Sequence, residues 1–310
     1  MTKSKRTYSR RDAALLCGGA LLSPAFVETA LAQAQKPMLA RPIPHGKGET
    51  IPAVGVGTSI VFNVGPQELA GPTAVIRAMV EGGGTLIDTA PSYGQAEGVV
   101  GDVLAQTGLR NKVFIATKLE AFIPGQEEAE TRGCLKALKT SKIDLLQLHN
   151  VRDPNQRMAG IDALKARGIC RYTGITTTFK SAYAATEAII KREKPDFLLV
   201  DYAIDNRDVE ARILPACQDA GTAVLVALPF GRGRLFRTAL GKQLPPWAAE
   251  FDCASWGQFF LKFLLAHPAI HAVAPGTSKA QHMIDNLGAG RGRLPDARMR
   301  ERMAQYVEAF

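Results

Sequence analysis

Four ionisable side chains stand at or just beyond the ends of three short apolar runs in the sequence. Asp88 ends the first run and Tyr93 follows it through a Pro-Ser turn, whereas Lys118 and His149 directly follow the second and third runs. A free tyrosine has a pKa of about 10, and a nearby ammonium favours the phenolate and lowers that pKa. Lys118 can supply the ammonium if Asp88 holds it by an ion pair, and His149 can donate or accept at the same position. Together these groups predict a phenolic acid/base that protonates an alkoxide as it forms.

The remaining polar residues indicate neither a metal centre nor an activated nucleophile. The spacings of Cys134, Cys170, Cys217 and Cys253 match no metal-binding pattern, and Ser92 has no evident basic partner. We therefore expect no metal, and we expect the four thiols to be free and buried. An ordinary structural turn is the alternative interpretation of the Pro-Ser-Tyr-Gly segment taken alone.

The elements that must position these residues alternate between short apolar runs and amphipathic segments. We expect a hairpin at 43–51 and core strands at 54–58, 85–88, 113–117, 144–148, 172–176, 197–200, 223–227 and 270–274. We expect helices at 66–81, 96–106, 127–138, 158–167, 181–192, 209–220, 254–266 and 279–287, and a tail helix at 296–309. Strands that are apolar throughout and separated by helices are typical of a parallel sheet buried on both faces.

Eight such strand and helix units in a chain of 310 residues predict an α/β fold, a (β/α)8 TIM barrel in a single domain. In this fold the carboxyl ends of the strands meet on one face, so all four ionisable groups converge there. A doubly wound open sheet is the alternative, but it normally carries a glycine-rich phosphate turn after its first strand. Segment 229–252 is long and irregular, and loops of that length in a compact domain tend to be functional.

Charge and composition narrow the class of partners. Hydrophobic residues make up 46% and charged residues 22% of the chain, values typical of a globular protein, and the net charge is +9. Part of this excess lies in the first 32 residues, and the rest forms no dense basic stripe with aromatic side chains. We therefore expect no nucleic-acid partner, whereas an anionic ligand is compatible with the moderately basic remainder.

The N-terminal segment 1–34 has the features of an export signal. Arg10 and Arg11 precede an uncharged run at 13–27, and small residues with an A-x-A pattern follow it. The segment resembles a twin-arginine signal, so we expect that export machinery as a partner, a periplasmic or exported location, and a barrel in 35–310. The apolar run is shorter than a membrane-spanning helix, so we expect no permanent span after cleavage. A general secretory signal or an uncleaved anchor is the alternative.

Asp88, Tyr93, Lys118 and His149 resemble the catalytic tetrad of the aldo-keto reductases, and the resemblance extends over 54–286. It implies a barrel that binds NADPH in extended form without a Rossmann motif. It further implies reduction of an aldehyde or ketone, in which hydride passes to the carbonyl carbon while Tyr93 protonates the oxygen. A small-molecule carbonyl compound is then the expected substrate.

Three segments resemble the family's cofactor-binding segments. Residues 174–178 resemble a G-V-S-N-F segment at the nicotinamide amide, 228–233 resemble an S-P-L-G-x-G loop over the pyrophosphate, and 275–286 resemble the segment around the adenosine phosphate. The resemblance implies cofactor contacts from Thr58, Asp88, Thr176, Thr177, Tyr202, Leu228, Phe230, Gly231, Gly233, Pro275, Gly276, Thr277, Ser278, His282, Asp285 and Asn286.

At five positions in or near these segments the chain departs from the family pattern. Thr177 replaces the usual Asn, Leu199 replaces a Gln, and Ala227 replaces the aromatic residue that stacks on nicotinamide. Gly276 and His282 occupy positions where Lys and Arg often bind the 2′-phosphate. These departures weaken the nicotinamide-binding site and make NADH a possible cofactor. A non-catalytic nucleotide-binding subunit, or a redox sensor with the same barrel, is therefore the alternative, and a barrel enzyme of another reaction class is the third interpretation.

Overall fold

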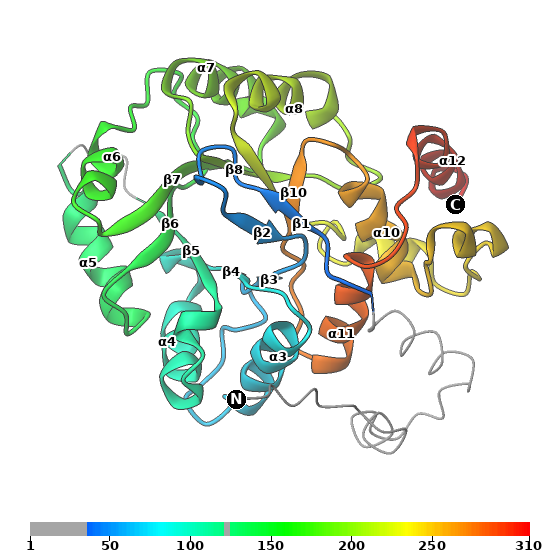
Figure 1. Ribbon diagram of the computed structural model, residues 1–310, viewed down its shortest axis with the longest axis horizontal. Coiled ribbons are helices and arrows are strands. Elements are labelled where there is room, and N and C mark those ends of the chain that lie inside the picture. The colour runs from blue at the N-terminus through cyan, green and yellow to red at the C-terminus, as the bar shows by residue number, and fades with distance from the viewer. Residues whose placement is uncertain (1–35, 121–124) are drawn as a thin grey trace.

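A ring of eight parallel strands forms the centre of the part of the chain that the structure describes, residues 36–120 and 125–310 (Figure 1). The strands follow one another around this computed structural model in the order of the sequence, and each pairs with the next. Isolated parallel bridges join Val54 to Val273 and Gly57 to Gly276, so the first and last strands meet and the ring closes. The (β/α)8 barrel predicted from the sequence is confirmed.

Every predicted core strand is present. The strands are β3 (Val56–Gly57), β4 (Leu86–Asp88), β5 (Phe114–Leu119), β6 (Ile143–Leu148), β7 (Cys170–Thr177), β8 (Phe197–Asp201), β9 (Ala223–Ala227) and β10 (Ile270–Val273). Lys118 lies within β5 rather than just after it, and β3 is shorter than the run expected at 54–58.

The helices that cover the ring also lie where the amphipathic pattern predicts them. They are α3 (Ala70–Glu81), α4 (Ala96–Thr107), α5 (Glu127–Ala137), α6 (Ala159–Ala166), α7 (Tyr183–Glu193), α8 (Val209–Ala220), α10 (Trp256–Leu265), α11 (Ala280–Ala289) and the tail helix α12 (Ala297–Glu308). The first of these was expected from position 66, but Gly65 and Glu68 form a turn whose N–H groups are satisfied locally, so the helix begins later. The irregular segment 229–252 contains the short helix α9 (Arg234–Thr238) and a 3-10 helix η4 (Pro246–Phe251).

An antiparallel hairpin precedes the barrel and closes one end of it. Its strands β1 (Ala40–Pro42) and β2 (Thr50–Pro52) flank the turn expected between 43 and 51. Ile43 and Ile51 are buried and pack into the cluster of side chains that fills the barrel interior. Figure 1 shows the hairpin lying across the ring of strands. At the opposite end the parallel strands finish, and the four ionisable groups are expected there.

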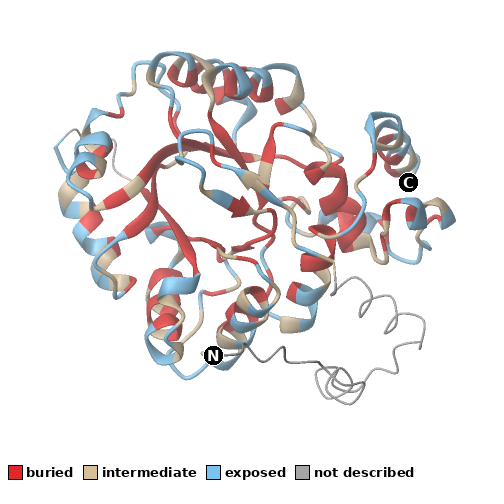
Figure 2. Cartoon of the chain, in the orientation of Figure 1, coloured by how far each residue is buried: buried red, intermediate tan, exposed pale blue. Residues whose placement is uncertain are grey.

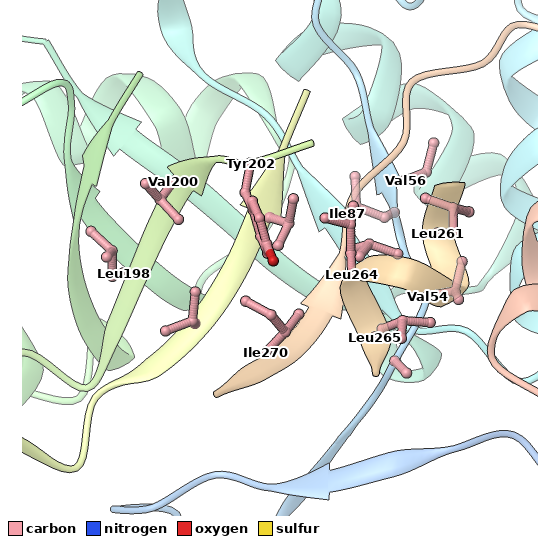
Figure 3. Close-up of a cluster of buried hydrophobic side chains, with 14 of the residues drawn as sticks. Val54, Val56, Ile87, Leu198, Val200, Tyr202, Leu261, Leu264, Leu265 and Ile270 are labelled. Carbon is pink, nitrogen blue, oxygen red and sulfur yellow. The ribbon is translucent and has the colours of Figure 1, made fainter. Parts of the chain in front are cut away.

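Two apolar cores result from the alternation of side chains along the strands. The inner core fills the barrel and stacks Phe114, Tyr172 and Phe197, whose ring centroids lie 5.4–6.0 Å apart. The outer core lies between the strands and the helices, and Figure 2 shows buried residues on both the strands and the facing sides of the helices. Figure 3 shows one part of the outer core, where Leu264 and Ile270 pack together. Burial of the strands on both faces is the reason that their sequences are apolar throughout.

The four cysteines of the described chain are free and buried, as expected from their spacing. Burial raises the pKa of all four thiols, and the pKa of Cys170 and that of Cys253 reach about 12. Such thiols react slowly because the thiolate is the nucleophile. A search of the described residues finds no helix long and apolar enough to cross a membrane. The expected signal segment 1–34 lies outside the described residues.

One residue of the loop after β3 has an unfavourable backbone conformation. Ile60 has a φ of 68° although its side chain is β-branched, and 73% of the residue is exposed. The left-handed region costs a residue with a Cβ roughly 1–2 kcal/mol. Little buried surface offsets that cost at this position.

We expect Ile60→Gly to raise the free energy of unfolding by about 0.5–1 kcal/mol, because relief of the backbone conformation exceeds the entropic cost of glycine. Chemical denaturation at a fixed pH measures the change. The matched control is Leu240→Gly, a large residue that is 84% exposed and has no positive φ. The control should lose stability, and equal effects of the two substitutions would contradict the explanation.

Candidate active site

The centre of the site is a buried ion pair between two adjacent strands. Asp88 is the last residue of β4, and Lys118 lies near the end of β5. The ammonium of Lys118 donates to Asp88 Oδ1 at 2.8 Å and to the carbonyl of Thr89 at 2.7 Å. Thr58 donates its hydroxyl to the carbonyl of Asp88 at 3.0 Å and so holds that backbone in place. Thr58, expected to contact the cofactor, supports the carboxylate strand in this structure.

Tyr93 stands directly over this pair. It is the last residue of a short 3-10 helix η1 (Pro91–Tyr93), which begins three residues after the end of β4. The ammonium of Lys118 lies 4.9 Å from the centroid of the Tyr93 ring. The predicted convergence of Asp88, Tyr93 and Lys118 is therefore present in the structure.

The direction of the Tyr93 pKa differs from the one expected from the sequence. Burial raises the pKa of Tyr93, Lys118 acts to lower it, and the net pKa lies above that of free tyrosine. Burial also acts to lower the pKa of Lys118, but Asp88 and Tyr93 outweigh it and that pKa is raised. The expectation of a lowered tyrosine pKa considered the ammonium alone and omitted desolvation of the ring. The result is a phenol that stays protonated at neutral pH, next to an ammonium that stays charged.

His149 follows β6 directly and faces Tyr93 edge-on, with ring centroids 6.2 Å apart. Its Nδ1 lies 2.6 Å from Oε2 of Glu120, a residue that the sequence reasoning did not identify. Burial acts to raise the pKa of Glu120, but the hydrogen bonds from His149 and Ser92 and the charge of His149 together outweigh burial and lower that pKa, so Glu120 is ionised at neutral pH. The alternation of side chains along β5 could have identified Glu120 as a candidate. Glu120 lies two positions after Lys118, so the two side chains point to the same side of the extended chain.

A second acidic residue lies behind β5, on the side away from the barrel interior. Glu97 on α4 is 6% exposed and accepts a hydrogen bond from Thr117 at 2.5 Å. Burial raises the pKa of Glu97, and Cys134 is a further hydrogen-bond partner. Thr117 precedes Lys118, so this contact fixes the strand that carries the lysine. Sequence patterns gave no signal for it, because a helical glutamate is usually exposed.

A small polar cluster lies beside the carboxyl end of β7, at the mouth of the barrel where the strands finish. The Asn150 N–H donates to Thr176 Oγ1 at 2.7 Å, and Thr178 donates both its N–H and its hydroxyl to Asn150 Oδ1 at 3.1 Å. Asn150 reaches this position because its φ is +51°. Thr176 and Thr177 are both buried. The sequence reasoning missed Asn150, which places a carboxamide beside Thr177, where the family's asparagine is absent.

The loop after β9 has an unusual run of positive φ values. Leu228, Gly231, Arg232 and Gly233 have φ values between 52° and 81°. A cavity of about 320 Å³ lies between this loop and the end of β8. Its lining residues are Lys180, Asp201, Asp205, Asn206, Leu228, Gly231, Arg232 and Arg234. Phe230, which belongs to the same loop, points into an aromatic cluster with Phe236 and Phe260.

The cations of this cavity differ in their availability. Arg234 forms a bidentate pair with Asp205 at 2.7 and 2.8 Å, so its charge is matched. Lys180 pairs with Asp208 at 2.5 Å on an exposed surface. Arg232 forms no ion pair within 4 Å among the residues that the structure describes, and it is therefore the cation best placed to meet an anionic ligand.

The segment after β10 borders the mouth on the other side. Gly276 is exposed and pairs with Gly57, and a Cβ at Gly57 would come within 2.7 Å of the Ala274 carbonyl. Thr277 donates its hydroxyl to the Lys279 carbonyl at 3.3 Å and accepts the Lys279 N–H at 3.2 Å. Gly57 therefore permits the close approach of β3 to the segment after β10, whereas the backbone at Gly276 is exposed to a ligand. Pro275 and Ser278, the other expected residues of the segment, flank Gly276 and Thr277 in the sequence.

Helix α11 carries the last three residues of the expected adenosine segment. His282 is exposed, whereas Asn286 is 4% exposed. Asp285 accepts hydrogen bonds from Ser255 at 2.7 Å and from Gln258 at 2.9 Å, and burial raises its pKa. Asp285 thus joins α11 to the first turn of α10.

Tyr202 does not lie at the mouth, in contrast to the expected cofactor contact. Its side chain is fully buried in the outer core, where Figure 3 shows it beside β8 and α10. Arg300 on α12 donates to the hydroxyl at 2.8 Å, and the hydroxyl donates to Glu210 on α8. The prediction failed because the side chain faces outward from the strand end, where three helices supply its partners.

No group of three or more His, Cys, Asp or Glu residues that could hold a metal ion occurs within 36–120 and 125–310. The arrangement instead combines a protonated phenol, a charged lysine and a histidine that has a carboxylate partner. Such a set can donate a proton to an oxygen that gains negative charge.

Comparison with known proteins agrees with this geometry. The model of the aldo/keto reductase family matches residues 53–304. Methylglyoxal reductase YeaE of Escherichia coli (strain K12) is 30% identical over 244 residues, which cover 76% of this chain and 84% of that protein. Aldo-keto reductase str7 of Strobilurus tenacellus is 25% identical over 301 residues, which cover 82% of this chain and 89% of that protein.

Solved structures share the fold. An aldo-keto reductase from Klebsiella pneumoniae in complex with NADPH has a TM-score of 0.72 at 22% identity, over 87% of this chain and 96% of that chain. The holo form of AKR11C1 from Bacillus halodurans has a TM-score of 0.69 at 24% identity, over 87% of this chain and 96% of that chain. Because the family model spans most of the chain and the tetrad converges at the barrel mouth, the chain belongs to the aldo/keto reductase family and is an oxidoreductase.

Proposed function

We propose that the protein reduces an aldehyde or ketone to an alcohol with NADPH and that Tyr93 is the general acid. The observation that carries the proposal is the position of the Lys118 ammonium, 2.8 Å from Asp88 and 4.9 Å from the centre of the Tyr93 ring. An alkoxide that forms near the phenol would lie beside a proton donor that its raised pKa keeps protonated. The adjacent Lys118 ammonium would stabilise the phenolate that remains after proton transfer.

The residues at the mouth fit a dinucleotide phosphate. The positive-φ loop 228–233, the cavity of about 320 Å³ and Arg232, which has no ion pair within 4 Å in the described part of the chain, suit a pyrophosphate. The exposed backbone at Gly276 suits a close ligand approach, and Asn150 with Thr176 suits a carboxamide. A related structure from Klebsiella pneumoniae contains NADPH. NADPH supplies the hydride when it is bound, and these residues would hold and orient it.

The chain's own side chains would handle the proton. Tyr93 donates its proton to the carbonyl oxygen as that oxygen becomes an alkoxide, and Lys118 stabilises the phenolate that remains. Asp88 keeps Lys118 under the ring, and the phenolate regains a proton from solvent. His149 would orient the carbonyl oxygen toward Tyr93 when the ring nitrogen that faces this oxygen carries a proton to donate. The alternative of a non-catalytic subunit or redox sensor has less support, because all four tetrad residues are present and assembled.

The name of the Escherichia coli relative indicates a first substrate class to assay. That protein is a methylglyoxal reductase, and it covers most of this chain. We propose that small 2-oxoaldehydes are among the substrates. A panel of methylglyoxal, simple aldehydes and simple ketones with NADPH tests the proposal directly.

We expect Tyr93→Phe to lower kcat for carbonyl reduction by about 10²–10⁴-fold, because it removes the general acid and keeps the ring. The affinity for NADPH, measured by fluorescence titration, should stay largely unchanged. Tyr306→Phe on α12 is the matched control and should keep normal turnover. Near-normal turnover of the Tyr93 variant would exclude it as the acid.

Cofactor choice provides a second test. Gly276 offers no charge to a 2′-phosphate, whereas His282, Lys279 and the Thr277 segment lie on the expected adenosine side. We expect NADPH to bind more tightly than NADH, and His282→Arg to strengthen NADPH binding by about 2–5-fold, the range of an exposed ion pair. NADH affinity should not change.

The matched control for cofactor choice is His45→Arg, which makes the same substitution in the hairpin at the closed end of the barrel. It should leave both affinities unchanged. Tighter binding of NADH than of NADPH by the wild-type protein would show that this segment does not recognise the 2′-phosphate.

We also propose that the protein is exported in folded form by the twin-arginine route, on the basis of Arg10, Arg11 and the apolar run at 13–27. We expect replacement of both arginines by lysine to leave the precursor in the cytoplasm. Cell fractionation followed by immunoblotting measures the location. An unchanged periplasmic yield of the double variant would refute this route.

A further inference from the structure

Glu120 connects two parts of the site. Its Oε2 lies 2.6 Å from His149 Nδ1, and its Oε1 accepts the N–H of Ser92 at 3.4 Å in the turn that carries Tyr93. Its own N–H donates to Glu130 at 2.9 Å, so the backbone of Glu120 is held as well. The His149 side chain is 13% exposed and the Glu120 side chain 35% exposed, which leaves the carboxylate in contact with solvent.

The chemistry of this contact determines where the proton of His149 sits. An ionised carboxylate can only accept hydrogen bonds, and a neutral imidazole has one donor and one acceptor nitrogen. The nitrogen that faces Glu120 at 2.6 Å must therefore carry the proton. The other nitrogen, Nε2, is then an acceptor in the neutral ring and a donor only in the charged ring.

We propose that Glu120 is a positioning residue that holds the proton of His149 on Nδ1, so that Nε2 donates to the carbonyl oxygen only when the imidazole is charged. This inference deepens the proposed carbonyl reduction and rests on it for its kinetic consequence. The electrostatic consequence for His149 itself does not depend on any substrate.

Within 36–120 and 125–310, the other groups around His149 do not provide an equivalent partner. Tyr93 lies edge-on at 6.2 Å between ring centroids, and the Lys118 charge is paired with Asp88. On the β7 side the neighbouring Asn150 and Thr176 are uncharged and bond to each other. Glu120 is therefore the ionised residue that determines which ring nitrogen is protonated.

Nitrogen-15 NMR of the full-length protein, labelled at histidine, tests the first half of the proposal without substrate. In the neutral ring, observed at the alkaline end of a pH titration, we expect His149 to be protonated on Nδ1 and unprotonated on Nε2. His149→Gln assigns the signal. A wild-type ring protonated on Nε2 would overturn the proposal.

Glu120→Gln tests the second half, because its amide can donate to Nδ1 as well as accept from it. We expect part of the neutral His149 population to move its proton to Nε2. The matched control is Glu128→Gln, which removes one negative charge from α5 at a site that pairs with Arg167. The control should keep the wild-type pattern of protonation. An unchanged His149 tautomer in the Glu120 variant would contradict the proposal.

The pH profile of kcat/KM for reduction shows whether the tautomer matters to turnover. The wild-type neutral ring offers no Nε2 proton, whereas the neutral ring of Glu120→Gln can offer one. We expect the ratio of kcat/KM at pH 9 to kcat/KM at acidic pH to be larger for Glu120→Gln than for the wild-type protein and the Glu128→Gln control. Equal ratios would overturn the proposed effect of the tautomer on turnover.

The two proposals fail separately. If the wild-type protein reduced no carbonyl compound, the proposed function would fail while the NMR measurement still judged the role of Glu120. If it reduced carbonyls with an unchanged profile in Glu120→Gln, the function would stand and Glu120 would have only a structural role.

Discussion

The buried ion pair between Lys118 and Asp88 is the constraint on which the rest of the site depends. Lys118 is 0% exposed, and a buried ammonium without a partner is costly to the folded state. The pair requires adjacent strands that end at the same height, which a parallel barrel provides. The bonds from Thr58 to the Asp88 carbonyl and from Thr117 to Glu97 then fix both strands. Removing one partner of such a pair would leave an uncompensated buried charge, which typically costs about 3–5 kcal/mol.

The architecture was predictable because its physical signals are local and repeated. A strand buried on both faces must be apolar throughout, and a helix that covers it must have one apolar face. Repetition of that pattern specified a closed barrel, and the barrel placed Asp88, Lys118 and His149 on one face. Boundaries shifted by a few residues where local turns competed, as at Gly65. The aldo/keto reductase family followed from the same residues.

The details of the site could not be predicted to the same extent, because they depend on the surroundings of single side chains. Glu120 and Asn150 act through neighbours that are distant in sequence. The alternation along β5 can indicate on which side Glu120 lies, but it does not predict the contact of Glu120 with His149 or that of Asn150 with Thr178. Tyr202 matched a family position but points toward the helices, which only the packing of α8, α10 and α12 determines. The Tyr93 pKa depends on the balance between desolvation and a nearby charge, and burial cannot be read from the sequence with the required accuracy.

The hairpin that closes one end of the barrel also determines from which side a ligand can reach the ionisable groups. With Ile43 and Ile51 packed into the interior, side chains of the described residues fill that end. Asp88, Tyr93 and Lys118 converge at the other end, where the parallel strands finish. A ligand that reaches these groups therefore approaches from the carboxyl ends of the strands.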